Sequence, residues 1–502
     1  MFRLFITAVV YVSLAGLANG ATIYVPENHA TIQGAIDASS NGDVVIVRAG
    51  TYMENIDFIG KAITVKSEPG AILTRIDGGQ AGPVVTLQNG EGPDSILDGF
   101  SITNGHSSDG GGIYCDFASP TVRNNRIHGN SVTKGSGGGI FCSMSQMVIS
   151  GNEIFGNSGS YGGGGIYCHR SDAVVTGNIV RDNSGSNSYG GGIYCYWCDP
   201  VIRDNVFTGN TTAKWGGGIF LVVSNAEVTG NIVIGNSASR GGGIDCYDRC
   251  NPRITNNTVV ANSAADEGGG LHCHSTCAIS VVNTILWGND APLGREIHVG
   301  DAATPSTLSI AYSDVEGGPA STHVEPGCTL NWGAGMIDAA PLFAEPANND
   351  YHLTWPSPCH NTGDNTAVTE LYDFEGDPRM ALGTVDMGAD EYYYHLYHMG
   401  DVVPGSPIDI KVVGIPGLPA LLVLGTGIQD PPLPTPHGDL WLTMPLAKSW
   451  SLGAIPGTGI LTFPATTPSV WPVGSEHPFQ ALVGPWGGAI TQLTNLMILT
   501  VE

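Results

Sequence analysis

A six-residue phrase, Gly-Gly-Gly-Ile-aromatic-Cys, recurs along the middle of the chain, with small variations in the later copies. The copies begin at Gly110, Gly137, Gly163, Gly190, Gly216, Gly241 and Gly268. Successive copies are 25 to 27 residues apart. A period in this range indicates that each repeat is one structural unit, stacked on the next.

Each repeat carries a second phrase, Asn-x-(Ile/Val/Phe)-x-x-Asn. Its first Asn falls at Asn125, Asn152, Asn178, Asn205, Asn231 and Asn257, and its second at Asn130, Asn157, Asn183, Asn210, Asn236 and Asn262; a looser copy has Asn283 and Asn289. Short apolar runs separated by Gly, Asn and Ser predict strands joined by turns. A unit this rich in Gly and Asn does not suit a helix. Two or three short strands per repeat are typical of one coil of a parallel β-helix.

In such a coil, like positions lie above one another at the strand spacing of roughly 4.8 Å. The Ile and Cys of the first phrase then form two inward columns, with Leu221 in place of one Cys. The residue between them points outward. The Asn positions are expected to form ladders of side-chain amides at the turns.

The opening of the chain completes the pattern. Residues 31–38 read Thr-Ile-Gln-Gly-Ala-Ile-Asp-Ala, with a short apolar helical face at Ile32, Ala35 and Ile36, and residues 42–52 contain a first strand and a turn. With the repeats, this resembles the right-handed parallel β-helix proteins of the pectin-lyase-like superfamily, above all bacterial secreted members. The resemblance covers roughly residues 22–394. It implies an all-β solenoid closed by an N-terminal capping helix, and it carries no activity with it.

Three segments are expected. Residues 1–20 have Arg3, an apolar run and a small-residue end, which predicts a secretory signal peptide. Residues 21–394 form the β-helix, whose last part contains the phrase Asp386-Met-Gly-Ala-Asp-Glu391, similar to the closing segment of secreted β-helix proteins. Residues 395–502 alternate short apolar runs with Pro/Gly turns, which predicts a small C-terminal β-sandwich. The protein is therefore expected to be secreted or at the cell surface, and no later stretch is long and apolar enough to span a bilayer.

The charge of the chain restricts its partners. The formal net charge is −26, and only 13% of residues are charged. This argues against nucleic acid and anionic membranes, which need clustered Lys and Arg. It also disfavours a strongly anionic polymer unless Ca²⁺ bridges the two. We identify no cofactor, keep Ca²⁺ as an open alternative, and expect a monomer.

The eleven cysteines allow three interpretations. Disulfides are one, because an exported chain permits them; the candidate pairs are Cys195–Cys198, Cys246–Cys250, Cys273–Cys277 and Cys328–Cys359. Zinc binding is a second, since two or three residues separate the local pairs. Core packing is the third, because Leu221 occupies the same column.

The outward column is rich in aromatic residues. We expect carbohydrate rings to stack on it, because sugars present apolar C–H faces to aromatic side chains. The candidate substrate-binding residues are Tyr114, Phe141, Tyr167, Tyr189, Tyr194, Trp215 and Phe220. The alternative is a ladder that only stabilises the sheet.

Farther along, polar residues replace the aromatic ones. The candidate catalytic residues are Asp245, Asp248, Arg249, Glu267, His272 and His274. Carboxylates, His and Arg in one patch suit general acid–base chemistry and charge stabilisation in glycan cleavage, or a pair of hydrolase carboxylates. The alternative is a solvated polar end of a sheet. The motifs of polygalacturonases and the spaced Lys and Arg of pectate lyases are missing.

Two functions follow from these patterns. The first is a secreted protein that binds extracellular polysaccharide in the side groove of the β-helix and degrades it as a polysaccharide lyase or glycoside hydrolase. The second is a non-catalytic adhesin or structural spacer at the cell surface.

Overall fold

The computed structural model describes most of the chain. The described residues are 20–185, 189–380, 383–393, 396–399, 406–413, 419–424, 428–435, 438–442, 448–458, 460–468, 476–483, 492–493 and 497–500. The predicted signal peptide therefore lies outside the described residues, apart from Gly20. No helix in the described part of the chain has the length and apolarity that a membrane crossing requires.

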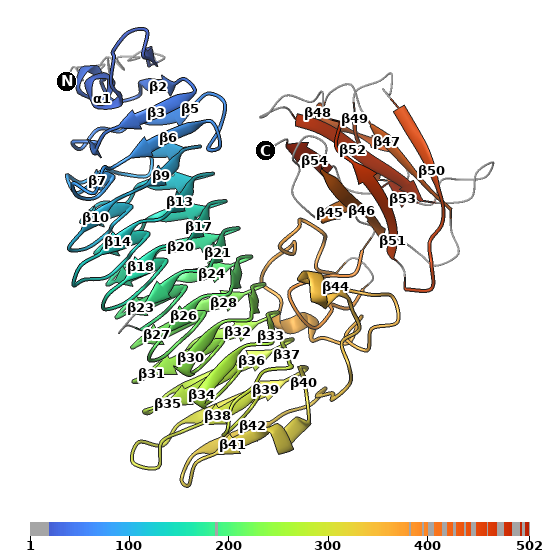
Figure 1. The fold of residues 1–502 in the computed structure, drawn as a ribbon. Helices are drawn as coiled ribbons and strands as arrows, with labels where there is room; N and C mark the ends of the chain where they lie inside the picture. Colours follow the sequence, from blue (N-terminus) through green and yellow to red (C-terminus); the bar gives the residue numbers. More distant parts are fainter. Residues whose placement is uncertain are drawn as a thin grey trace, which may run out of the picture.

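The first two thirds of the described chain wind into a parallel solenoid of four sheets (Figure 1). Sheet A consists of β1 (Thr22–Val25), β2 (Val44–Val47), β5 (Thr64–Ser67), β8 (Ile96–Asp98), β12 (Thr121–Arg123), β16 (Val148–Ser150), β20 (Val174–Thr176), β24 (Val201–Arg203), β28 (Glu227–Thr229), β32 (Arg253–Thr255), β36 (Ala278–Val282), β39 (Thr307–Ala311) and β42 (Thr329–Trp332). Sheet B consists of β3 (Gly50–Met53), β6 (Thr74–Asp77), β9 (Ser101–Thr103), β13 (Arg126–His128), β17 (Glu153–Phe155), β21 (Ile179–Arg181), β25 (Val206–Thr208), β29 (Ile232–Ile234), β33 (Thr258–Val260), β37 (Ile285–Trp287) and β40 (Asp314–Val315).

The other two sheets come from the glycine-triplet side of each repeat. Sheet C consists of β4 (Ile56–Asp57), β7 (Val85–Leu87), β11 (Ile113–Asp116), β15 (Ile140–Ser143), β19 (Ile166–His169), β23 (Ile193–Tyr196), β27 (Ile219–Val222), β31 (Ile244–Tyr247), β35 (Leu271–His274), β38 (Ile297–Val299) and β41 (Thr322–Val324). Sheet D consists of β10 (His106–Ser107), β14 (Ser131–Val132), β18 (Ser158–Gly159), β22 (Ser184–Gly185), β26 (Thr211–Thr212), β30 (Ser237–Arg240) and β34 (Ser263–Glu267). Each coil pairs with the next in parallel, so the predicted solenoid is confirmed.

The register of sheet C confirms the predicted columns. Ile113 pairs with Ile140, and Cys115 pairs with Cys142, and the same correspondence continues to β35. Both inward columns are buried in one continuous apolar core. Because a parallel coil repeats its side-chain directions, each copy of the phrase contributes the same two residues to the core.

All eleven cysteines are free thiols. The first Cys of each repeat lies in the core column, where the Sγ atoms of Cys142 and Cys168 are 3.5 Å apart. Cys359 instead donates to Oδ2 of Asp314 at 3.2 Å, whereas Cys328 lies beside Ser306, so the expected bridge between them is not formed. The structure thus favours packing over the disulfide and zinc interpretations.

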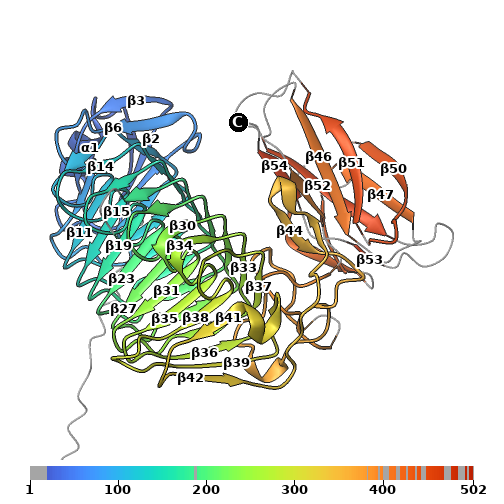
Figure 2. The same cartoon turned by 60° about the horizontal axis from the view of Figure 1, so that its bottom comes forward.

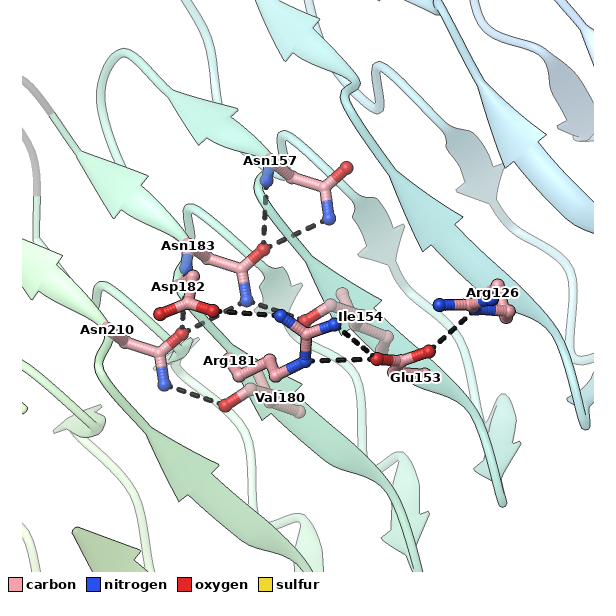
Figure 3. Close-up of polar contacts among 9 residues, drawn as sticks. All are labelled: Arg126, Glu153, Ile154, Asn157, Val180, Arg181, Asp182, Asn183 and Asn210. Carbon is pink, nitrogen blue, oxygen red and sulfur yellow. Dashed lines mark hydrogen bonds and ion pairs between the residues drawn. The ribbon is translucent and has the colours of Figure 1, made fainter. Parts of the chain in front are cut away.

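Asparagine side chains form two buried ladders along the turns. Figure 3 shows one of them, where Nδ2 of Asn157 donates to Oδ1 of Asn183 and Nδ2 of Asn183 donates to Oδ1 of Asn210, each at 3.0 Å. Each amide also donates to a strand carbonyl of the preceding coil, as Asn183 does to Ile154 at 2.8 Å. Buried amides that are fully hydrogen-bonded fix the register of neighbouring coils.

The ladder of second asparagines ends at Asn289, which accepts from Asn262 but donates to Glu296 rather than to a further amide. Nδ2 of Asn289 donates to Oε2 of Glu296 at 2.6 Å, and its backbone N–H donates to Oε1 at 3.0 Å. The other member of the looser copy, Asn283, leaves its ladder, and Thr284 takes that position. Asn283 bonds instead to Asp364.

Helix α1 (Ile32–Ala38) closes the N-terminal end, as predicted. Thr31 caps it by accepting a hydrogen bond from the N–H of Gly34 at 3.0 Å, and its apolar face of Ile32, Ala35 and Ile36 is buried on the first coil. The helix therefore covers core that would otherwise be exposed at the end of the solenoid.

After the coils the chain turns back along the outer face of sheet B. This segment contains β43 (Phe343–Glu345), η2 (Pro346–Asn348), β44 (Asp350–Leu353) and η3 (Asn365–Ala367), whereas η1 (Gly318–Ser321) comes earlier, just before β41 in the last coil. The side-chain amide of Asn256 donates to the carbonyl of Asp386, and Thr258 accepts from the N–H of Ala389. Asp373 accepts from two N–H groups of its own turn, as expected for a turn-forming Asp.

The C-terminal segment forms antiparallel sheets that lie beside the solenoid in both views (Figures 1 and 2). Its strands are β45 (Leu396–Met399), β46 (Pro407–Val413), β47 (Pro419–Leu424), β48 (Ile428–Thr435), β49 (Gly438–Leu442), β50 (Lys448–Ala454), β51 (Ile460–Thr466), β52 (Glu476–Val483), β53 (Gln492–Leu493) and β54 (Met497–Thr500). Strand β46 pairs with β51 in one sheet, and β47 pairs with β50 and β52 in another.

Candidate functional site

The outer face of sheet C carries one continuous column of side chains. The register joins Tyr114, Phe141, Tyr167, Tyr194, Phe220, Asp245 and His272, and then continues to His298 and His323. The residues that precede the glycine triplets form a second column beside it, including Tyr189, Trp215, Arg240 and Glu267. The two predicted columns are therefore adjacent across the Gly-rich strip.

The glycine triplets allow these two columns to come close together. Gly241 has φ +59°, and a Cβ there would lie 2.4 Å from Cβ of Asp245. Gly268 has φ +64°, and a Cβ there would lie 2.7 Å from Cβ of His272. Because a larger residue would be strained and would clash, glycine is required where the chain folds over the outward side chains.

Aromatic rings stack along the first part of the column. The ring centroids of Tyr114 and Phe141 are 5.3 Å apart, those of Phe141 and Tyr167 are 5.5 Å apart, and those of Tyr194 and Phe220 are 4.9 Å apart. These distances follow the strand spacing and suit aromatic contacts.

Tyr189 and Trp215 cover the last rings of this ladder. Their rings lie 5.5 Å and 6.2 Å from that of Phe220, which is 1% exposed. Burial also raises the pKa of the Tyr167 and Tyr194 hydroxyls above their usual range. Of the seven predicted binding residues, Phe220 is therefore beneath the surface. The other six are partly exposed: Tyr114, Phe141, Tyr167, Tyr189, Tyr194 and Trp215.

Carboxylates and histidines gather where the aromatic ladder ends. Oδ1 of Asp245 lies 3.1 Å from Nε2 of His274 and 3.4 Å from Nδ1 of His272. Oε2 of Glu267 lies 3.7 Å from Nε2 of His272. The structure thus brings together four of the six predicted catalytic residues.

Burial determines the ionisation of this cluster. It lowers the pKa of His272, and it lowers that of His298 to about 3, with the neighbouring histidines adding to the effect. Burial opposes ionisation of Asp245, but His272 and His274 outweigh it and hold the pKa of the carboxyl below its usual range. The carboxylate of Asp245 therefore lies next to the neutral imidazole of His272, a combination that can transfer protons or bind a metal cation.

Asp248 and Arg249 lie apart from the cluster. They occupy the turn after β31 with φ values of +56° and +57°, and Nε of Arg249 bonds to Oδ1 of Asp248 at 3.0 Å. Both side chains are open to solvent. The two residues neutralise each other instead of facing Asp245.

Sequence reasoning did not predict the histidines that extend the column. His298 packs with its ring centroid 4.9 Å from that of His272, and His323 follows at 5.0 Å from His298. In the copy that begins at Gly294, Arg and Glu replace two glycines, so the phrase is hard to see. The 26-residue step from Leu271 to Ile297 is the signal that could have found it.

Comparisons with known proteins agree with the solenoid. A model of the right handed beta helix region matches residues 76–228 and 199–286. No curated protein matches the chain.

Two solved structures are similar to the chain. One is a mutant of the PL6 family alginate lyase AlyGC, with 14% identity and a TM-score of 0.29; the match covers 77% of this chain and 60% of that one. The other is the enzymatically active domain of bacteriophage CBA120 tailspike protein 4, with 12% identity and a TM-score of 0.29, covering 91% of this chain and 64% of that one. The chain spans less than two thirds of the length of either structure, and neither likeness bears on its activity. The family model and the parallel register of the coils together show the fold of the chain, a right-handed parallel β-helix.

Proposed function

We propose that this protein binds an extracellular polysaccharide along the outer face of sheet C and cleaves it at the cluster around Asp245. The observation that carries the proposal is the single column in which stacked aromatic rings lead directly into carboxylates and histidines. A polymer laid along this column would meet similar side chains at each coil, roughly every 4.8 Å. It would reach ionisable groups at the end.

Partly exposed rings support the binding step. Tyr114 and Phe141 lie at one end of the ladder, and Tyr189 and Trp215 cover its other end. Tyr161, at the edge of the same face, is 68% exposed. Flat rings that keep one face accessible can stack on the C–H faces of sugars. The acidity of the chain favours a neutral polymer, or an acidic one bridged by Ca²⁺.

The pair of Asp245 and His274 supports the cleavage step. The carboxylate holds the imidazole at 3.1 Å, which is the arrangement of a proton-carrying histidine and the acid that orients it. His274 lies against Trp215, with ring centroids 5.3 Å apart, so it is next to the proposed binding surface. His272 and Glu267 complete the candidate catalytic set, and Asp248 and Arg249 lie outside it.

A second function, that of a non-catalytic spacer or adhesin, is favoured by the burial of Phe220 and by the stacking of the rings on one another along the ladder. Stacking that serves only the sheet would need no ligand. We propose in addition that residues 395–502 form a β-sandwich beside the solenoid of residues 21–394 and contribute to surface attachment. Apolar residues of β46, β47 and β52 share one core, which supports this division.

A glycan panel tests the proposed function with the full exported chain. We expect retention on at least one polysaccharide in affinity electrophoresis, and new reducing ends or an unsaturated product on incubation. Tyr114→Ala should weaken retention by at least about tenfold, whereas Phe155→Ala on sheet B, a matched half-buried aromatic, should leave it unchanged. Binding without cleavage would support the adhesin, and no binding to any glycan would contradict both steps.

A further inference from the structure

Two buried histidines on the outer face of sheet C have no hydrogen-bond partner. The ring nitrogens of His272 and His298 are all without one among the described residues, although the two residues are 0% and 1% exposed. Buried polar groups in folded proteins are almost always paired, so four orphan nitrogens at adjacent positions require an explanation.

The distances around these rings exceed those of hydrogen bonds. Nε2 of His272 lies 3.7 Å from Oε2 of Glu267, and Nε2 of His298 lies 3.8 Å from Oε1 of Glu325. Direct hydrogen bonds between such groups are about 2.7–3.2 Å long. Two ligands on one tetrahedral Zn²⁺, each bound at about 2.0–2.2 Å, lie roughly 3.3–3.6 Å apart. The 3.7 Å between His272 and Glu267 is thus close to the spacing of two ligands on a shared cation.

We propose that Glu267, His272 and His298 bind a divalent transition-metal cation, with Zn²⁺ as the best match. One donor atom from each residue lies within 4.8 Å of the other two. Two imidazole nitrogens and one carboxylate are typical of Zn²⁺ sites, whereas Ca²⁺ and Mg²⁺ prefer oxygen ligands alone. This site does not depend on glycan binding.

The surrounding residues supply the outer support that metal-binding histidines usually have. Nδ1 of His272 faces Oδ1 of Asp245 at 3.4 Å, while Nε2 faces Glu267, so the carboxylate of Asp245 can orient the ring. His323 bonds to Glu325 at 3.1 Å and stacks on His298. The outer edge of the site is Glu267, whose side chain is 21% exposed and which also lies 3.4 Å from Nε of Arg240.

A neighbouring group of three donor atoms also has suitable distances, but it is the weaker candidate for the cation site. Asp245, His272 and His274 also place three donor atoms within 4.8 Å of one another. However, Nε2 of His274 already has Oδ1 of Asp245 at hydrogen-bond distance. The ring nitrogens of His272 and His298 have no hydrogen bond that a cation would have to break.

Metal titration of the full chain tests the proposal. After chelator treatment and dialysis, we expect one equivalent of Zn²⁺ to bind in calorimetry and to raise the melting temperature. Co²⁺ in the same site should give visible absorption bands typical of mixed nitrogen and oxygen ligands. His272→Gln and His298→Gln should each abolish these bands, whereas His128→Gln, which changes a ring stacked on Phe155 in sheet B, should leave them intact.

Asp245→Asn provides a graded test, because changing a residue that orients a ligand typically weakens metal binding by about 10–100-fold. Failure of the full chain to bind Zn²⁺ or Co²⁺ would overturn the proposal. So would binding that persists in both ligand variants, because the cation would then be elsewhere, for example at His352, Glu375 and Asp390, whose donor atoms also lie within 4.8 Å of one another. If the ligand variants do not fold, anomalous scattering from Zn²⁺-soaked crystals of the unaltered chain decides: a peak between Glu267, His272 and His298 supports the site, and a peak elsewhere overturns it.

Discussion

Replacing Asn183 by alanine removes one step of the buried amide ladder shown in Figure 3. Asn183 accepts hydrogen bonds from the backbone N–H of Asn157 at 3.1 Å and from its Nδ2 at 3.0 Å. It donates to the carbonyl of Ile154 and to Oδ1 of Asn210. The substitution therefore removes four hydrogen bonds at once, all of them buried.

The expected cost follows from which groups keep a partner. The N–H of Asn157 loses its acceptor, and a buried unsatisfied group costs about 1–3 kcal/mol. Nδ2 of Asn157 still bonds to Ile127, and Oδ1 of Asn210 still accepts from the N–H of Asn183, so these losses are nearer 1 kcal/mol each. We expect Asn183→Ala to lower the free energy of unfolding by about 3–5 kcal/mol.

Urea unfolding followed by circular dichroism measures this cost, with Asp182→Asn as the matched control, because Asn removes the charge and tolerates the φ of +53° at this position. Asp182 is the adjacent residue, and its exposed carboxylate bonds to Arg181 at 2.9 Å. Losing an exposed ion pair costs about 0–1 kcal/mol. If the two variants are equally stable, the amide ladder does not hold the coils in register, and the reasoning is refuted.

Three further perturbations test other parts of the fold. Burial raises the pKa of Glu296 from 4.5 to about 8, so protonation of Glu296 stabilises the fold fully below pH about 4.5, and this contribution is lost as the pH rises through 8. Glu296→Gln should therefore flatten the pH dependence of the free energy of unfolding between these values. An unchanged slope would show that Glu296 does not cause it. Arg379 is 1% exposed among the carboxylates of the closing segment, where its positive charge opposes the rise in the pKa of Asp373 and Asp386. Arg379→Ala should lower the free energy of unfolding by about 3 kcal/mol and speed proteolysis of residues 360–393. A protease-resistant variant would show that Arg379 does not hold this segment in place. Leu221 fills the core column between Cys195 and Cys246. Leu221→Ala should therefore lower the free energy of unfolding, measured with heat or urea, by about 2–5 kcal/mol. A loss below about 1 kcal/mol would mean that the column is loosely packed.

The periodicity of the sequence was sufficient to predict the solenoid. A 25-to-27-residue step, repeated six times, places Ile113 over Ile140 and Asn157 over Asn183 without any further information. This works because each coil contacts mainly its neighbours, so one correct repeat predicts the next. The capping helix was predictable for a related reason, since the open end of a coil must be covered.

The rest depends on contacts between distant parts of the chain. The closing segment packs on sheet B through pairs such as Asn256 with Asp386, which are 130 residues apart. Nothing local in either residue indicates this pairing. The covering of Phe220 by Trp215 similarly depends on how far the glycine turn folds over the sheet. The histidines after His272 were missed because two glycines of their repeat are replaced by Arg and Glu.

Stacking in register has different consequences for different side chains. Along sheet C, aromatic rings gain from a neighbour about 5 Å away in the next coil, so the ladder from Tyr114 to Phe220 needs no ligand to be stable. Histidines gain little from such a neighbour, because like charges repel when they are protonated and buried nitrogens lack partners when they are neutral. His272, His298 and His323 are nevertheless stacked beside Glu267 and Glu325. A cation that binds the ring nitrogens would therefore stabilise the folded chain. The polar end of sheet C is for this reason the part of the column where a bound ligand would add stability.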